Sequence, residues 1–256
     1  DRAAMDAISA DLAAANIDSR VQFCDVTKVD SLEELAQKAV SEFGAIDLVF
    51  ANAGIGAGES GAMWDYSEKD WQWCLNVNMW GVINSIRVFM PILVEQGTPA
   101  HFVVTGSGNG GLLVYPDQPI YTASKAAVHT ITENLHYQTM AGSLPVKVSA
   151  LFPGPHVVDT GLFNSGRVRP EDLKKETEGN DTGINSVAEM KRYLMENFGM
   201  ELETTHPDEV AEIAIEGLEN DAFWLLKTTP ETDAKLRARL DMIMSRSTPL
   251  PETVGG

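Results

Sequence analysis

The sequence predicts an α/β fold with a doubly wound parallel sheet, which is a sheet covered by helices on both faces. Two observations lead to this prediction. Short apolar runs alternate along the chain with longer amphipathic stretches, the order expected when each strand is followed by a helix. The strand-like runs are apolar throughout, as is typical of parallel strands buried on both sides. A length of 256 residues fits one such unit, and we treat residues 1–256 as a single domain.

The individual elements follow from hydrophobic periodicity and from the residues that begin and end helices. The predicted strands are 21–24, 47–51, 101–105, 146–152 and 223–226. The predicted helices are 3–15, 31–43, about 67–94, 121–140, 207–218 and 231–245. Gly44 supplies the end of the second helix, and Ser67 with Asp70 forms a capping box that opens the third. Pro91 is expected to bend the third helix near its end.

The composition argues against several kinds of partner. With 37 acidic and 19 basic residues the net charge is −18, which disfavours nucleic acid and anionic membrane surfaces. Two cysteines, Cys24 and Cys74, provide no disulfide framework, so we expect a cytoplasmic protein. We expect no signal peptide, and no apolar run approaches the roughly 20 residues that span a bilayer. We predict no metal site and a small-molecule substrate.

Residues 155–205 interrupt the regular alternation of strands and helices. The segment is polar and charged, and it is inserted between a predicted strand and a predicted helix. Ligands of open α/β sheets bind beyond the carboxyl ends of the strands, so an insertion here is expected to form a substrate lid. A disordered surface excursion is the alternative. The apolar residues that favour a lid or an oligomer contact are Leu194, Met195, Phe198 and Met200.

Tyr121 and Lys125 lie four residues apart, which places a phenol and an ammonium one turn apart on the same face of a helix. A nearby cation favours the phenolate, so we expect Lys125 to lower the pKa of Tyr121 from about 10 toward neutrality. A tyrosine with such a pKa can act as a general acid or base. By itself the spacing also occurs in ordinary helices.

Further residues accompany this pair along the chain, namely Asn52-Ala53-Gly54, Asn78, Ser107 and Pro153-Gly154. The set resembles the short-chain dehydrogenase/reductase family, and the resemblance extends from Asp1 to about Leu226. It implies a Rossmann-like fold. It also implies an oxidoreductase that transfers a hydride between NAD(P) and a secondary alcohol or ketone.

The resemblance assigns catalytic roles to four residues. Tyr121 would be the general acid or base, and Ser107 would donate a hydrogen bond to the substrate oxygen, with Thr105 as a less favoured substitute. Lys125 would lower the pKa of Tyr121 and bind the ribose next to the nicotinamide. Asn78 would kink its helix so that a backbone carbonyl binds a water of the proton relay.

The resemblance also implies a cofactor site, with NAD favoured and NADP as the alternative. Asp1 would accept a hydrogen bond from the ribose 2′-hydroxyl and select NAD, whereas Arg2 could instead bind a 2′-phosphate. Thr160 would bind the nicotinamide carboxamide, although it lies about two residues later than in the family pattern. The remaining residues implied at the cofactor are Asp25, Val26, Asn52, Ala53, Gly54, Tyr121, Lys125, Pro153 and Gly154.

The family pattern begins with a strand, a glycine-rich turn and a helix that have no counterpart here. Gly56, Gly58 and Gly61 match the G-x-G-x-x-G spacing, but the following helix is expected only near Ser67, so we interpret this run as a loop and not as the phosphate site. We therefore expect the chain to be a fragment, incomplete at the N-terminus, that binds a dinucleotide poorly by itself.

Three further expectations concern function and assembly. A non-redox or cofactor-sensing relative of the same fold is the alternative to an oxidoreductase, and the intact catalytic set argues against it. Helices 67–94 and 121–140 are apolar on more than one face, which together with the resemblance predicts a homodimer or homotetramer. The run from Pro153 to Pro170 also resembles family members that oxidise bulky arylpropanoid alcohols.

Overall fold

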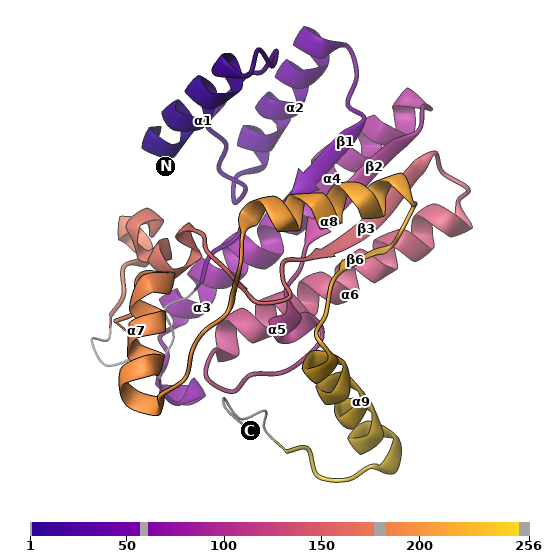
Figure 1. Cartoon of the computed structure of the whole chain (residues 1–256). Coiled ribbons are helices and arrows are strands. Elements are labelled where there is room, and N and C mark those ends of the chain that lie inside the picture. The colour runs from indigo at the N-terminus through magenta and orange to yellow at the C-terminus, as the bar shows by residue number, and fades with distance from the viewer. Residues whose placement is uncertain (1, 57–60, 177–182, 251–256) are drawn as a thin grey trace.

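The computed structural model describes residues 2–56, 61–176 and 183–250. Its centre is a sheet of four parallel strands in the order β1-β2-β3-β6 (Figure 1). The strands are β1 (Leu48–Ala51), β2 (Ala100–Thr105), β3 (Val146–Phe152) and β6 (Trp224–Leu226). All four run in the same direction, so their carboxyl ends meet at one edge of the sheet.

One face of the sheet is covered by long helices that share the main hydrophobic cluster. Alternate residues of β2, Phe102 and Val104, are fully buried against this cluster. The helices that share the main cluster on this face are α2 (Val29–Phe43), α4 (Gly81–Gln96) and α6 (Pro119–Ala141). Leu32 of α2 and Leu93 of α4 belong to the same core, so these helices are held by apolar burial. Helix α3 (Glu68–Leu75) packs against α6 through a separate cluster that contains Trp73 and Ile120.

The opposite face of the sheet is covered by α8 (Pro207–Glu219), which crosses in front of the strands in Figure 1. Val103, which lies between Phe102 and Val104, points to this side and packs with Val210 and Ala214 of α8. Because successive strand residues face opposite sides, the middle of β2 carries apolar side chains at consecutive positions. The predicted α/β class, with a parallel sheet and helices on both faces, is confirmed.

Helices α3 and α4 are joined without a break by η2 (Asn76–Trp80), a turn of π-helix. The continuous segment Glu68–Gln96 has 29 residues and is long and apolar enough by composition to cross a membrane. Half of its most apolar window is buried inside the fold. Its position in the core therefore explains why it is apolar. The expectation that no run approaches the length needed to span a bilayer did not include this continuous helix.

The remaining described elements are shorter or lie at the periphery. Neither α1 (Arg2–Ala14) nor α9 (Pro230–Ser245) contributes a buried residue, and Figure 1 shows them at opposite ends of the molecule. The others are η1 (Met63–Asp65), α5 (Gly108–Gly111), β4 (Val157–Val158), η3 (Gly161–Val168), η4 (Glu171–Leu173), α7 (Val187–Phe198) and β5 (Thr204–Thr205).

Most predicted elements occur within one or two residues of their expected bounds, and the capping box of Ser67 and Asp70 is present. The strand predicted at 21–24 is wrong. These residues pair with no described strand, and Phe23 is 62% exposed. A short apolar run becomes a strand only when a neighbour satisfies its backbone groups, and here α2 begins a few residues later without one. Asp1 and Gly58 lie outside the described residues.

Candidate active site

The predicted catalytic residues gather at the carboxyl ends of β1, β2 and β3. Asn52 follows β1, and its Oδ1 accepts a hydrogen bond of 2.8 Å from the hydroxyl of Thr105 at the end of β2. The carbonyl oxygen of Thr105 accepts a bond of 2.9 Å from Nζ of Lys125, which reaches up from α6. These bonds join two strand ends to one helix, so the lysine is held where ligands of such sheets bind.

Asn78 is fully buried in the π-helical turn, and its side chain joins three parts of the site. Its Oδ1 accepts from the amide of Ile55 at 2.8 Å, and its Nδ2 donates to the carbonyl of Ile55 at 3.0 Å. Nδ2 also lies 3.0 Å from Oγ of Ser124 in α6. The predicted distortion of this helix is observed as the π turn, a feature often found at functional sites.

Gly54 lies close to the polar atoms of the site. A Cβ placed on it would be 3.5 Å from Oδ1 of Asn78 and 3.6 Å from Nζ of Lys125. Glycine therefore keeps open the space beside the buried ammonium, and a ligand can approach this backbone closely. Asn52, Gly54, Asn78 and Lys125 form one continuous polar group.

Tyr121 lies in the first turn of α6 with a buried side chain. Burial raises the pKa of Tyr121 above its ordinary value, and a side-chain hydrogen bond with Ser107 opposes the shift. Ser107 begins α5, and its Oγ also accepts from the amide of Asn109 at 3.2 Å. The Ser107 hydroxyl therefore lies beside the phenol, where both can face one substrate oxygen.

The expectation that Lys125 lowers the pKa of Tyr121 is wrong, because the pKa of Tyr121 is raised in the structure. Nζ of Lys125 is 6.0 Å from the centre of the Tyr121 ring, and it is not among the groups that shift the phenol. Burial lowers the pKa of Lys125 itself from 10.5 to about 8. The cost of desolvation, which favours the neutral form of both groups, is the largest cause of each shift.

Asp25 and Val26 lie on the approach to α2. Oδ1 of Asp25 accepts from the amide of Thr27 at 3.0 Å and from its hydroxyl at 2.8 Å. Val26 packs against Gly81, where a Cβ would lie 2.7 Å from Cγ2 of the valine. The backbone before α2 is thus fixed against the helix that carries Asn78.

Pro153 and Gly154 directly follow β3, at the edge where Asn52 and Thr105 lie. Thr160 is exposed, and its hydroxyl accepts from the amide of Leu162 at 3.4 Å. The structure thus gives Thr160 a capping role at the start of η3. Its predicted contact with a carboxamide stays a prediction.

Two buried residues of this region were missed by the sequence. Ser124 has no exposed surface and donates from Oγ to the carbonyl of Tyr121 at 2.7 Å. Cys74 is equally buried, with Sγ 3.4 Å from Nδ2 of Asn78. The position of Ser124, a small polar residue one turn after Tyr121 on the inward face, was the signal that could have identified it.

Known proteins are similar to this chain in sequence. The sequence model of the short chain dehydrogenases matches residues 1–168. The CLA biosynthesis dehydrogenase/reductase of Lactiplantibacillus plantarum is 29% identical over 230 residues, which cover 88% of this chain and 75% of that protein. An uncharacterized oxidoreductase of Staphylococcus aureus strain MRSA252 is 34% identical over 151 residues, which cover 59% of this chain and 61% of that protein.

Solved structures are similar over nearly the whole chain. A short chain dehydrogenase/reductase from Burkholderia phymatum in complex with NAD is 33% identical with a TM-score of 0.85, and the match covers 99% of this chain and 86% of that one. An alcohol dehydrogenase from the archaeon Thermococcus sibiricus, complexed with 5-hydroxy-NADP, is 23% identical with a TM-score of 0.58. That match covers 82% of this chain and 72% of the other, and at this identity it shows the fold alone.

Proposed function

We propose that this chain, which belongs to the short-chain dehydrogenase/reductase family, interconverts secondary alcohols and ketones. It is an NAD(P)-dependent oxidoreductase. Tyr121 is the proposed general acid and base. The observation that carries the proposal is the hydrogen-bonded pair of Ser107 and Tyr121 beside the buried Lys125. The NAD complex of the similar Burkholderia phymatum protein supports the choice of cofactor.

The residues at the strand ends fit the nicotinamide half of a dinucleotide. Gly54 leaves space beside Nζ of Lys125, which a side chain would fill. The ammonium donates one bond to Thr105 and has two further N–H donors for ribose hydroxyls. The other residues proposed to hold the cofactor are Asn52, Ala53, Pro153, Gly154 and Thr160, with Asp25 and Val26 toward the adenine.

The chain's own residues would manage the proton and the developing charge. Bound NAD(P) supplies or accepts the hydride. In ketone reduction the phenol of Tyr121 donates its proton to the oxygen that becomes the alcohol, and Ser107 donates a hydrogen bond to the same oxygen. The raised pKa of Tyr121 keeps the phenol protonated in that direction. In oxidation the phenolate of Tyr121 accepts the proton of the alcohol and returns to the phenol.

Turnover of a ketone panel tests this function. We expect the absorbance of the reduced nicotinamide to fall when the protein is mixed with NADH or NADPH and a reactive ketone. Bulky aryl ketones should be included in the panel. Tight cofactor binding without turnover of any ketone or secondary alcohol would instead identify a cofactor-sensing relative.

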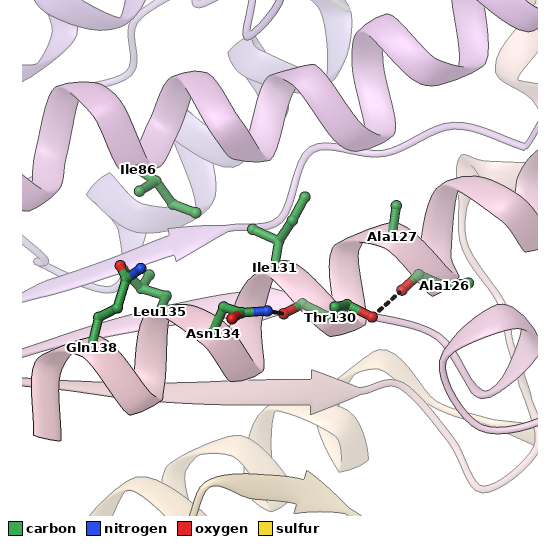
Figure 2. A pocket seen from close by; sticks show the side chains of 8 residues that line it. All are labelled: Ile86, Ala126, Ala127, Thr130, Ile131, Asn134, Leu135 and Gln138. Atoms are coloured by element: carbon green, nitrogen blue, oxygen red, sulfur yellow. Dashed lines mark hydrogen bonds between the residues drawn. The ribbon is translucent and has the colours of Figure 1, made fainter. Parts of the chain in front are cut away.

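The outer faces of α4 and α6 are proposed to pair with a second copy of the chain. Figure 2 shows a shallow groove between these helices. It is lined by Ile86, Ala126, Ala127, Thr130, Ile131, Asn134, Leu135 and Gln138. Of the apolar residues on which the prediction rested, Val82 and Val128 are buried in the core, whereas Ile86 and Ile131 remain partly exposed at the groove.

A dimer or tetramer is therefore expected by light scattering at micromolar concentration. Thr130→Arg should dissociate it, because Thr130 is exposed in the groove and the new guanidinium would be desolvated in the interface. Tyr137→Arg, on the same helix but outside the groove, is the matched control and should leave the assembly intact. A monomeric wild-type protein would contradict the proposal.

Asp1, which lies outside the described residues, is proposed to give preference for NAD through the ribose hydroxyls. Replacing Asp1 with Ala should weaken NAD binding by roughly tenfold to a hundredfold, which is the loss of a charge-assisted hydrogen bond of about 1.5–3 kcal/mol. It should also relax the rejection of NADP, since Arg2 could then pair with the phosphate. Equilibrium binding of both cofactors is the measurement, and a wild-type preference for NADP would show that Arg2 dominates.

A further inference from the structure

We infer that the buried ion pair between Arg169 and Asp70 positions the substrate lid over the active site, and that it thereby controls substrate affinity. This inference rests on the proposed function and on the lid predicted at residues 155–205, of which the structure describes 155–176 and 183–205. Arg169 lies between η3 and η4 of that segment, and Asp70 lies in the first turn of α3. The pair is a positioning device that acts through the lid.

Arg169 is held by three different contacts. Its Nη2 is 2.8 Å from Oδ1 of Asp70, and its Nε donates to the carbonyl of Leu173 at 2.5 Å. Its guanidinium carbon lies 4.7 Å from the centre of the Trp73 ring, which adds a cation–π contact. The first and third contacts join the lid to α3, and the second folds the lid back on itself. The planar guanidinium thus fixes both position and orientation.

Both oxygens of the Asp70 carboxylate accept hydrogen bonds in this arrangement. Its Oδ2 accepts from the amide of Ser67 at 3.0 Å and from the Ser67 hydroxyl at 2.7 Å, so Oδ1 remains for Arg169. These hydrogen bonds and the adjacent guanidinium lower the pKa of Asp70 despite its burial. The carboxylate is therefore ionised, and removal of Arg169 would leave a buried charge without its cation.

A second ion pair between the same two segments provides a contrast. Nζ of Lys69 is 2.8 Å from Oε1 of Glu176, but these side chains are 39% and 53% exposed. The side chains of Arg169 and Asp70 are only 9% and 4% exposed. Exposed pairs contribute little because water and salt screen them, whereas a buried, hydrogen-bonded pair is costly to break. Of these two ion pairs, the one between Arg169 and Asp70 is therefore the one that holds this part of the lid.

The lid that Arg169 holds is in contact with the loop that carries the catalytic network. Oγ of Ser165 in η3 accepts from the amide of Gly56 at 3.0 Å, and a Cβ on Gly56 would lie 3.2 Å from the carbonyl of Leu162. Ile55, the residue before Gly56, is the backbone partner of Asn78. A shift of η3 would thus open the site beside Gly54 while leaving Tyr121 and Ser107 on their own elements.

The base of the lid is held by contacts that do not involve Arg169. β4 and β5 pair in parallel at its base, where the amide of His156 donates to Oγ1 of Thr205 at 3.0 Å. Nε2 of His156 also lies 3.1 Å from Oε2 of Glu203. This base would remain closed without Arg169. Loss of the ion pair should therefore loosen residues 161–173 and leave the base of the lid closed.

The test compares Arg169→Met with wild type by hydrogen–deuterium exchange and by steady-state kinetics at saturating cofactor. We expect the amides of residues 161–173 to exchange at least about tenfold faster, with α6 unchanged. The substrate KM should rise by about tenfold or more, while kcat stays within about twofold, because the catalytic groups do not belong to the lid. Asp70→Asn, which keeps the size of the side chain, should shift both quantities in the same direction.

Lys69→Met is the matched control, since it removes the exposed pair between the same two segments, and it should change neither exchange nor KM. Unchanged exchange in Arg169→Met and Asp70→Asn would overturn the inference. So would faster exchange with an unchanged KM, or an equal effect of Lys69→Met. If the wild-type protein turned over no ketone or alcohol, the proposed function would fail, and exchange alone would still decide whether Arg169 holds the lid.

Discussion

Replacing Tyr121 with Phe is expected to lower kcat by about 10²–10⁴-fold, the usual contribution of a general acid or base. The variant lacks only the hydroxyl, so it keeps the buried ring but loses the proton donor and the hydrogen bond with Ser107. Cofactor affinity should change little, because the ring and Lys125 remain. Steady-state kinetics and equilibrium cofactor binding measure the two effects separately.

Tyr137→Phe is the control for the Tyr121 experiment. Tyr137 lies on the same helix and is 60% exposed, so removing its hydroxyl should leave kcat unchanged. Near-wild-type turnover by Tyr121→Phe would remove this tyrosine from the mechanism. Ser107 would then be the only one of the two hydroxyls left to serve the substrate oxygen.

Replacing Lys125 with Met is expected to abolish turnover and to make the stability less dependent on pH. Burial lowers the pKa of Lys125 from 10.5 to about 8, so the folded state disfavours the proton that the unfolded chain binds. This destabilisation is fully present below pH 8 and is relieved as pH rises toward 10.5. The shift corresponds to about 3 kcal/mol of destabilisation at neutral pH, which Lys125→Met would remove. Part of this gain is offset, because the carbonyl of Thr105 loses its hydrogen-bond donor at a cost of about 1–3 kcal/mol.

The free energy of unfolding of Lys125→Met minus that of wild type should therefore have its largest value at pH 7. It should decline by about 2–3 kcal/mol between pH 7 and pH 10.5. Denaturant titration of both proteins at several pH values measures this difference and cancels the titration of all shared groups. Lys147→Met, which removes an exposed lysine, should show no comparable trend. A constant difference across this range would mean that Lys125 keeps its ordinary pKa when folded.

The fold could be predicted because its strands are apolar on both faces. β2 shows why: Phe102 and Val104 face one layer of helices while Val103 faces α8, so these three consecutive positions are apolar. The run 21–24 is equally apolar, yet whether it pairs depends on a neighbour that local sequence does not reveal. Strand formation depends on long-range pairing, and this limits prediction from periodicity.

The catalytic set could be located from spacing, but its electrostatics could not. The four-residue spacing of Tyr121 and Lys125 placed both side chains on one face, whereas the dominant cause of their pKa shifts is burial, which appears only in three dimensions. The partnership of Arg169 with Asp70 joins residues 99 positions apart. No local pattern indicates such a contact, although the capping box had already identified Asp70.

The most direct test of the proposed function is the transfer of deuterium from a reduced nicotinamide to a ketone. We expect the wild-type protein, mixed with a cofactor deuterated at the transferred position, to yield an alcohol labelled at the carbinol carbon. The rate of this transfer should fall by about 10²-fold or more in Tyr121→Phe. An unlabelled alcohol, or equal transfer rates in the two proteins, would contradict hydride transfer assisted by Tyr121.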